Sequence, residues 1–282
     1  MSEDKALSRR DLLKTGGAAA AATAVAGVLP ISKAEGANAG LPRWAMIIDL
    51  RKCIGCRGCT VACKSEFGVP LGRWSAVVKQ IESGKYPKAR KDFLPRLCNH
   101  CSGGKEEVPP CVKICPQYPL DRKEFVTPDG KVHKYRDGAT YKRPDGMVLF
   151  DNSQCIGCGK CIEKCPYGVR YFNPFVTAGK DNTKNGIGKC TLCQHRVDKG
   201  LIPSCVNTCQ GSARIFGDLN DPDSEVSRLV KEFNLLKDRE KTTLLPQEKT
   251  EPYVFYIDPK NVLKAYKINS KKKEAEFNDQ II

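Results

Sequence analysis

Sixteen cysteines in four quartets constrain this 282-residue chain more than any other feature of its sequence. Two quartets are compact, with the spacing Cys-x-x-Cys-x-x-Cys-x-x-x-Cys, and two are split by a loop between closer pairs. The compact quartets are Cys53, Cys56, Cys59, Cys63 and Cys155, Cys158, Cys161, Cys165; the split ones are Cys98, Cys101, Cys111, Cys115 and Cys190, Cys193, Cys205, Cys209. This cysteine content indicates that bound cofactors help to hold the fold together.

The two halves of the chain match beyond their cysteines. The compact quartets are offset by 102 residues, Asp49 and Asp151 precede them at the same interval, and both open with Cys-Ile-Gly-Cys. Each split quartet closes with Cys-x-x-x-Cys. The order compact, split, compact, split therefore predicts an internal duplication.

The compact spacing is typical of four-iron clusters. It places three thiolates around one tight loop, and in bacterial ferredoxin runs the last cysteine, often followed by proline, binds the other cluster of a pair. Cys115 and Cys165 are each followed by proline. A split quartet taken alone also resembles a tetrahedral zinc site. Because the compact quartets suit one closed zinc site poorly, we expect iron–sulfur clusters in place of zinc or disulfides.

The formal net charge of +15 by itself suggests nucleic acid or an anionic membrane surface as a partner. A cubane cluster with its four thiolates carries a net charge of about −2. Four such clusters on a chain without residues 1–39 would leave a net charge of about +6. The basic excess is interpreted as compensation for the clusters, so no nucleic-acid partner is expected.

The N-terminus resembles a twin-arginine export signal. Arg9 and Arg10 precede a mild Ala/Gly stretch over 15–31, which is too short and too weakly apolar for a spanning helix. Ala37-Asn38-Ala39 predicts cleavage before Gly40, so residues 1–39 are expected to be the signal peptide. Export after cluster insertion would protect the thiols from an oxidising compartment. No later segment is long and apolar enough to predict a membrane span.

Short elements are expected around the quartets. Residues 46–48 and 147–150 are predicted strands that lead into the compact quartets. Asp-Gly pairs at 129–130 and 145–146 predict two hairpins. Apolar spacing predicts a helix over 224–236, residues 253–256 are a predicted strand, and Lys271-Lys272-Lys273 is interpreted as a solvated tail.

Several residues beside the cysteines have two interpretations. Gly55, Gly58, Gly157 and Gly159 allow the backbone to approach a cluster closely, so that its amides reach the sulfurs. Ile54 and Ile156 are expected to shield metal or to pack the loops. His100 and His195 are either donors near sulfur or structural residues, and the structural interpretation is favoured. Tyr167 is expected to pack and not to relay electrons.

The sequence resembles the four-cluster iron–sulfur subunits of molybdopterin oxidoreductases of the dimethyl-sulfoxide-reductase superfamily, particularly the exported tetrathionate and polysulfide reductase type. The resemblance runs from about residue 41 to about residue 257. It is carried by residues 43–49 (Arg-Trp-Ala-Met-Ile-Ile-Asp), 95–101 (Pro-Arg-Leu-Cys-Asn-His-Cys), 165–174 (Cys-Pro-Tyr-Gly-Val-Arg-Tyr-Phe-Asn-Pro) and 189–193 (Lys-Cys-Thr-Leu-Cys).

The resemblance implies that compact and split quartets exchange one ligand each to hold four [4Fe-4S] clusters. The implied ligand sets are Cys53, Cys56, Cys59 and Cys209 for cluster 1; Cys190, Cys193, Cys205 and Cys63 for cluster 2; Cys98, Cys101, Cys111 and Cys165 for cluster 3; and Cys155, Cys158, Cys161 and Cys115 for cluster 4. Every implied position is cysteine, which favours four cubanes over a three-iron variant.

The expected fold is α+β, with two ferredoxin-like modules, a β-hairpin insertion and a C-terminal extension. The first module is expected to comprise 40–90 and 186–220 with quartets 1 and 4, and the second 91–185 with quartets 2 and 3. The insertion is expected at about 117–137, where the chain exceeds its relatives and either contacts a partner or is a tolerated surface addition. Residues 221–282 form the expected extension.

The resemblance also implies function. The chain is expected to be a non-catalytic electron-transfer subunit of an exported respiratory complex, at the periplasm or the outer face of the cytoplasmic membrane. Its implied partners are a molybdopterin-containing catalytic subunit at the cluster 1 and 2 pair, and a membrane quinol-oxidising subunit or cytochrome at the other pair. The alternative is the equivalent subunit of an oxidising complex of the formate dehydrogenase or hydrogenase type.

Overall fold

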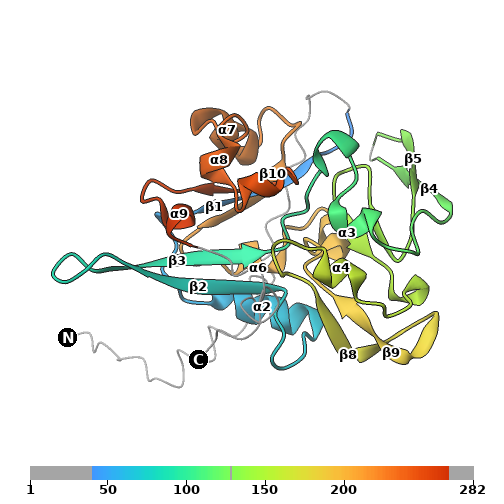
Figure 1. The fold of residues 1–282 in the computed structure, drawn as a ribbon. Coiled ribbons are helices and arrows are strands. Elements are labelled where there is room, and N and C mark those ends of the chain that lie inside the picture. Colours follow the sequence, from blue (N-terminus) through green and yellow to red (C-terminus); the bar gives the residue numbers. More distant parts are fainter. Residues whose placement is uncertain (1–39, 128, 267–282) are drawn as a thin grey trace, which may run out of the picture.

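The computed structural model describes residues 40–127 and 129–266. The expected signal peptide and the lysine run at 271–273 lie outside the described residues. Within them, short helices and small sheets are connected by cysteine-bearing loops, in a mixed helix-and-sheet fold (Figure 1). No helix of this described part has both the length and the apolar character needed to cross a membrane.

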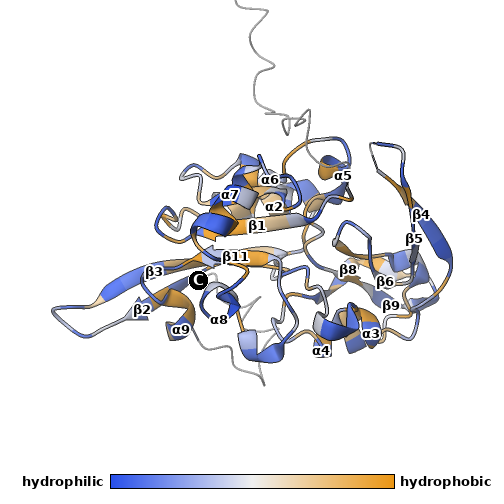
Figure 2. Cartoon of the chain, turned by 90° about the horizontal axis from the view of Figure 1, so that it is seen from above, coloured by the Kyte–Doolittle hydropathy of each residue, from blue (hydrophilic) through white to orange (hydrophobic). Residues whose placement is uncertain are grey.

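A three-stranded sheet lies at the centre of the N- and C-terminal parts of the chain. β1 (Trp44–Asp49) pairs antiparallel with β10 (Arg214–Asp218) and parallel with β11 (Val254–Ile257). Met46, Ile47 and Ile48 are fully buried, and Figure 2 shows β1 and β11 as hydrophobic ribbons. The predicted strands at 46–48 and 253–256 are confirmed.

The helix α7 (Glu225–Glu232) packs on this sheet through Val226 and Val230. It begins where expected, because the hydroxyl of Ser224 accepts a hydrogen bond from the N–H of Ser227 and so caps the helix. It ends four residues before the predicted boundary. Asn234 adopts a left-handed conformation (φ 52°), which stops the helix and lets the N–H of Leu235 reach the carbonyl of Val230.

Shortening one buried valine on α7 should lower stability measurably. Val226 is fully buried, so Val226→Ala removes apolar contact and leaves a void, with an expected cost of about 2 kcal/mol. The thermal midpoint of the cluster-loaded protein should fall by about 4–8 °C. The matched variant Val126→Ala changes a side chain that is 58% exposed, and its midpoint should stay within about 1–2 °C of the parent. Equal shifts for the two variants would contradict the packing described for α7.

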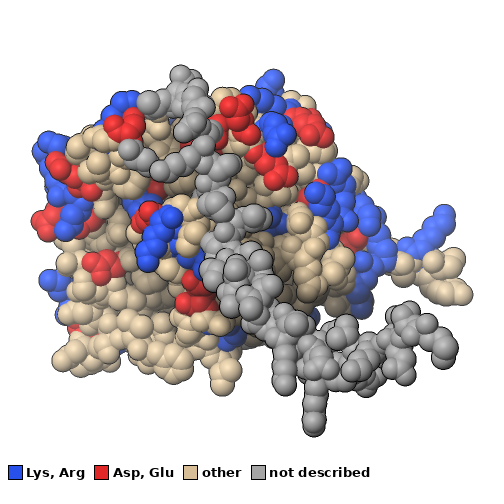
Figure 3. Space-filling view, turned by 180° about the vertical axis from the view of Figure 1, so that it is seen from behind, with Lys and Arg blue, Asp and Glu red and all other residues tan. Residues whose placement is uncertain are grey.

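One long hairpin connects each compact quartet to the split quartet that follows it. β2 (Ala76–Ser83) pairs with β3 (Arg90–Leu97), and β8 (Tyr171–Ala178) pairs with β9 (Asp181–Gly188). β3 ends directly before Cys98, and β9 ends two residues before Cys190. The β2–β3 hairpin projects from the body of the protein and carries Lys and Arg side chains (Figures 1 and 3).

Both hairpins predicted from Asp-Gly pairs are present. β4 (Arg122–Val126) pairs with β5 (Val132–Arg136), and β6 (Thr140–Lys142) pairs with β7 (Val148–Phe150). The first lies within the expected insertion and forms a largely hydrophilic ribbon at the edge of the molecule (Figure 2). The remaining helical elements are α2 (Gly58–Phe67), η1 (Gly104–Glu106), α3 (Pro110–Lys113), η2 (Asn152–Gln154), α4 (Lys160–Glu163), α5 (Gln194–Val197), α6 (Ser204–Asn207), α8 (Arg239–Thr242), η3 (Pro246–Glu248) and α9 (Val262–Ala265).

The expected module boundaries fall inside two of these hairpins. The pairing runs from Ala76 with Leu97 to Ser83 with Arg90, so a boundary at 90/91 would cut the ladder. Likewise Tyr171 pairs with Gly188 across a boundary at 185/186. Each hairpin is continuous in hydrogen bonding across the expected boundary.

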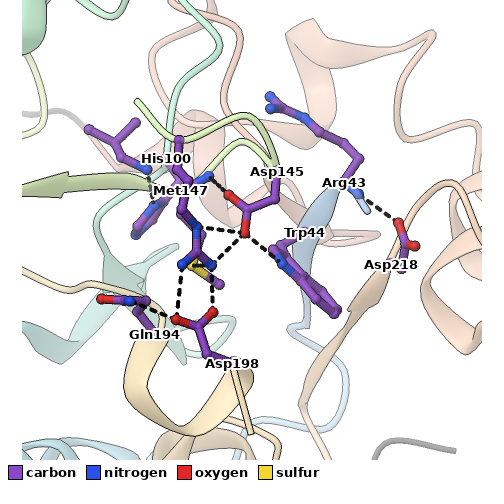
Figure 4. A network of polar contacts seen from close by, with 10 residues as sticks. Arg43, Trp44, His100, Asp145, Met147, Gln194, Asp198 and Asp218 are labelled. Atoms are coloured by element: carbon purple, nitrogen blue, oxygen red, sulfur yellow. Dashed lines mark hydrogen bonds and ion pairs between the residues drawn. The ribbon is translucent and has the colours of Figure 1, made fainter. Parts of the chain in front are cut away.

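One buried polar network connects the turn between β6 and β7 to strand β1 and to the C-terminal end of helix α5 (Figure 4). Asp145, in the turn between β6 and β7, is fully buried and accepts hydrogen bonds from the guanidinium of Arg143 and from the indole N–H of Trp44 on β1. Arg143 also forms a two-point ion pair with Asp198, which follows α5. Phe125 of the hairpin β4–β5 lies under the guanidinium of Arg143, 4.6 Å away.

Candidate metal centres

The two compact quartets are placed by the same local backbone. In each, the first two cysteines lie on a loop and the third lies on a short helix, α2 or α4. Each helix is preceded by a left-handed residue, Arg57 (φ 61°) or Gly159 (φ 72°), which turns the loop back toward the helix. The repeated spacing thus folds into a repeated thiol-lined loop.

Four thiols from two different quartets line one cavity. Three of them, Cys98, Cys101 and Cys111, belong to the first split quartet, and the fourth is Cys165 of the second compact quartet. Cys165 lies two residues beyond the end of α4, whereas Cys155 and Cys158 lie on the loop before this helix and Cys161 lies on it.

Two further cavities have the reverse composition, three thiols of a compact quartet and one of a split quartet. One cavity is lined by thiols of the second compact quartet and by Cys115. The other is lined by thiols of the first compact quartet and by Cys209. The compact thiols are Cys155, Cys158 and Cys161 in the first case, and Cys53, Cys56 and Cys59 in the second.

The remaining four cysteines also face one another. Burial raises the pKa of Cys63 well above its usual value, and the charges of Cys190, Cys205 and Cys193 raise it further because their thiols are close by. The structure therefore brings the sixteen cysteines into four groups. No quartet forms a group on its own.

The donor set and its spacing fit a multi-iron group. Within residues 40–127 and 129–266, no set of three or more His, Cys, Asp or Glu side chains is placed to hold a single metal ion. The thiols instead line cavities, as sulfur ligands at the corners of a larger inorganic core would. All donors are cysteines, the ligand type that iron–sulfur clusters take.

Backbone amides point at several of these sulfurs. The N–H of Gly157 donates to Cys155 Sγ at 3.3 Å, the N–H of Leu192 to Cys190 Sγ at 3.4 Å, and the N–H of Ala213 to Cys209 Sγ at 3.2 Å. Such donors stabilise sulfur that carries negative charge. At Gly157 a side chain would be strained (φ 63°), and its Cβ would lie 2.5 Å from the Cβ of Lys184, so glycine is required there.

Burial disfavours the thiolate form of two of the interior cysteines. Burial raises the pKa of Cys165 to about 11 and that of Cys193 to about 12, with neighbouring thiols adding to the effect. Binding as thiolates requires loss of these protons, so the buried sites exchange protons for metal. Their burial also keeps water away from the sulfurs.

Two of the four groups reach the surface and two are interior. Cys56 and Cys158 are exposed, whereas Cys165, Cys190 and Cys205 are buried. Ile54 is 62% exposed and lines the cavity beside Cys56, and Ile156 lines the corresponding cavity beside Cys158. The two surface groups are therefore accessible from outside this chain.

The three polar or aromatic residues with two interpretations each contact other residues of the chain, and Tyr167 also lines the cavity beside Cys101. His100 is buried, and its Nδ1 accepts the N–H of Val148 on β7 at 3.0 Å. His195 is half exposed and pairs with Glu66 of α2 at 2.7 Å. The hydroxyl of Tyr167 lies 2.6 Å from that of Thr250, within the core.

Three buried cations beside the thiols were missed by sequence reasoning. They are Arg170, Lys189 and Arg214, each no more than 4% exposed. A weak signal was present: each arginine follows the last cysteine of a quartet by five residues, and Lys189 directly precedes Cys190. The sequence shows that they are near a quartet, but not that they point inward.

Comparisons with known families define the class of protein. Residues 89–219 match a family model described as a 4Fe-4S dicluster domain, and residues 44–65 match one described as a 4Fe-4S binding domain. Residues 6–26 match the model of the twin-arginine translocation pathway signal sequence, which supports export by that route. The chain is thus an iron–sulfur protein with ferredoxin-type four-iron domains.

Curated relatives narrow the class to a family. The chain is 36% identical to a tetrathionate reductase subunit of Salmonella typhimurium, over 83% of each chain. It is 35% identical to the arsenate respiratory reductase iron–sulfur subunit of a Shewanella species, covering 79% of this chain and 100% of the relative. The chain belongs to the iron–sulfur subunit family of molybdopterin oxidoreductases. Like its relatives, it is an electron-transfer iron–sulfur subunit.

Proposed function

We propose that this chain carries electrons through four [4Fe-4S] clusters within an exported respiratory reductase complex. The observation that carries the proposal is the arrangement of the sixteen thiols in four groups, two interior and two at the surface. When bound, each cluster accepts and gives up one electron without any change in its ligands. The chain is the scaffold of this relay and is not itself the catalyst.

The proposed ligands follow the four groups. They are Cys53, Cys56, Cys59 and Cys209 for cluster 1; Cys63, Cys190, Cys193 and Cys205 for cluster 2; Cys98, Cys101, Cys111 and Cys165 for cluster 3; and Cys115, Cys155, Cys158 and Cys161 for cluster 4. Because quartets are exchanged within each pair, clusters 1 and 2 are neighbours, as are clusters 3 and 4.

The two pairs meet in the interior. Cys98 is the leading source of charge at Cys190 after burial itself, so the groups of clusters 2 and 3 face each other. The resulting order is surface, interior, interior, surface. The residues of this chain hold the sulfurs with backbone N–H groups, exclude water from the middle of the path and leave both ends accessible.

The proposed modules follow from the same pairing. Clusters 1 and 2 lie in a first ferredoxin-like module, and clusters 3 and 4 in a second, which is inserted into the first. The continuous hairpins support boundaries after Leu97 and near Lys189, a few residues beyond those expected from sequence. The C-terminal extension contributes β11 to the sheet of the first module.

The proposed partners are a molybdopterin-containing catalytic subunit at the cluster 1 end and a membrane quinol-oxidising subunit or cytochrome at the cluster 4 end, with the complex on the periplasmic side of the membrane. One relative is the menaquinone reductase iron–sulfur cluster-binding subunit of Nitratidesulfovibrio vulgaris, 30% identical over 76% of this chain. That relative supports a quinone-linked partner. The family membership supports the molybdopterin subunit.

A second candidate function is the same relay with electrons flowing in the opposite direction, from the catalytic subunit through this chain to an acceptor. The chain is 34% identical to a sulfite dehydrogenase subunit of Allochromatium vinosum, over 76% of this chain and 82% of that protein. A dehydrogenase would deliver electrons to this chain at the catalytic end. The geometry of the relay is the same in both directions.

Purification of the intact complex from the exported fraction of its native cells tests the proposal. We expect about sixteen irons per chain, broad absorbance near 400 nm and a co-purifying molybdopterin subunit. Reduction of the clusters by a quinol would assign the first candidate, and reduction by the substrate of the large subunit the second. Colourless protein without iron, or a complex without a pterin subunit, would refute the proposal.

A further inference from the structure

Within the described residues, three buried cations lie beside the cysteine groups. Arg170, Lys189 and Arg214 are 1%, 4% and 3% exposed. Burying a charge is costly unless an opposite charge compensates for it. The positions of the three side chains relative to the cysteine groups therefore indicate what compensates for them.

Arg214 lies between the groups assigned to clusters 1 and 2. It lines the cavity of cluster 1, and among neighbouring charges that of Cys59 in this group contributes most to raising the pKa of Arg214. Its Nη1 is also 3.8 Å from the Sγ of Cys205, in the group of cluster 2. The guanidinium thus contacts the sulfur ligands of both neighbouring clusters.

Arg170 has the corresponding place in the second pair. Its Nη2 donates to the Sγ of Cys111 at 3.2 Å, in the group of cluster 3. Its Nη1 donates at 3.3 Å to the hydroxyl of Thr140, which lines the cavity of cluster 4. The next strongest charge on this guanidinium after that of Cys111 comes from Cys161, a thiol of cluster 4.

Lys189 lies where the two pairs meet. Its Nζ donates to the backbone carbonyl of Cys190, in the group of cluster 2, at 2.7 Å. It also donates to the carbonyl of Val148, a residue that lines the cavity of cluster 3. Its ammonium is therefore held between the two interior groups by bonds to the backbone of both sides.

We propose that each of the three steps along the relay contains one buried cation, which raises the reduction potentials of the two clusters that flank it. The inference rests on the proposed ligand sets. A Cys₄ cluster carries about −2 when oxidised and gains a further negative charge on reduction. A fixed positive charge between two such groups, screened little because water is excluded, stabilises the reduced form of each.

The same cations also lower the electrostatic repulsion between neighbouring dianionic clusters. Four groups of about −2 each repel one another in a poorly solvated interior. One cation per step reduces that repulsion where the groups are closest. Surface charge cannot do this equally well, because Lys and Arg on the surface are interspersed with Asp and Glu and are screened by water (Figure 3).

A purely structural role is the competing explanation. Lys189 could serve only to bond two carbonyls, and the arginines only to fill space. Charge-retaining variants separate the two: Lys189→Arg, Arg170→Lys and Arg214→Lys keep the positive charge, whereas Lys189→Met, Arg170→Met and Arg214→Met remove it. A matched control is Lys160→Met, which removes an exposed cation between Cys158 and Cys161.

The test uses the full chain in its native complex, with iron content and EPR-monitored reductive titration as readouts. Each EPR signal is assigned to a cluster by its loss in a variant that lacks cysteine ligands of that cluster. Arg214→Met should lower the equilibrium constant for one-electron reduction of clusters 1 and 2 at least tenfold, about 59 mV, and leave cluster 4 unchanged. Arg170→Met should do the same to clusters 3 and 4, and Lys189→Met to clusters 2 and 3.

The charge-retaining variants and Lys160→Met should each shift every potential by less than half as much. Equal shifts in matched Met and charge-retaining variants, or shifts shared evenly by all four clusters, would overturn the inference. Loss of iron from a Met variant but not from its charge-retaining partner supports it, whereas loss from both shows a packing role and overturns it. Fewer than four clusters in the parent would instead refute the proposed ligand sets.

Discussion

Replacing Cys98 and Cys165 together by alanine should remove one cluster, about four irons per chain, and leave the other three clusters intact. The two residues belong to different quartets and are separated by 66 intervening positions, but they line the same cavity. Their removal leaves two thiols there, which cannot hold a cubane. Iron analysis and the number of reduced [4Fe-4S] signals in EPR measure the result.

The contrasting variant removes two thiols of a single quartet. Cys155 and Cys165 are neighbours in sequence but line different cavities. Cys155→Ala with Cys165→Ala should therefore damage two clusters and cost up to about eight irons per chain. The pair closer in sequence has the larger effect, which is the reverse of what independent quartets would give.

Both variants carry two Cys→Ala changes at buried positions, so each is the control of the other for loss of packing. Secondary structure measured by circular dichroism in the far ultraviolet should be the same in the two proteins. If each quartet held its own cluster, the Cys98/Cys165 protein would lose the larger number of irons. That outcome would refute the exchanged ligand sets.

The local parts of this fold could be predicted from the sequence. The cysteine loops depend on spacings of three or four residues, and the hairpins at Gly130 and Gly146 depend on Asp-Gly turns, so both are encoded within a few positions. β1 was recognisable from its short apolar run. In each case the signal and the structure span the same few residues.

The non-local parts could not be predicted in the same way. The β2–β3 and β8–β9 hairpins have no Asp-Gly turn, and Asn173 and Thr177 lie at irregularities of the second ladder, which obscure its alternation. Arg170 and Arg214 look in the sequence like ordinary surface cations. Their burial follows only from the meeting of distant cysteine groups, which no local pattern records.

Asp145 has one role that is local in sequence and another that involves residues distant in sequence. Its place before Gly146 predicts a turn, and the turn is present. The sequence does not show that its carboxylate also accepts hydrogen bonds from Arg143 and from Trp44. Trp44 lies on β1, 101 residues earlier in the chain. Through Arg143 the contact continues to Asp198, so a turn of one part of the chain is tied to a strand and a helix end of the other.

Asp145→Ala should therefore be among the most destabilising single substitutions in this protein. It leaves Arg143, which is 7% exposed, with Asp198 as its remaining ion-pair partner, and it removes the acceptor of the Trp44 indole N–H. Breaking a buried ion pair in this way costs about 3–5 kcal/mol. The thermal midpoint of the cluster-loaded protein should fall by about 6–20 °C.

The matched control is Glu106→Ala, which breaks an ion pair with Lys113 of similar length, 2.8 Å against 2.6 Å. Both of its side chains are more than half exposed, so its loss should cost at most about 1 kcal/mol. Comparable shifts of the thermal midpoint for the two variants would show that the Asp145 network does not stabilise the packing of the β6–β7 turn against β1 and α5. If only Asp145→Ala lowers the midpoint strongly, and all iron is retained below the new midpoint, the network stabilises this packing independently of the clusters.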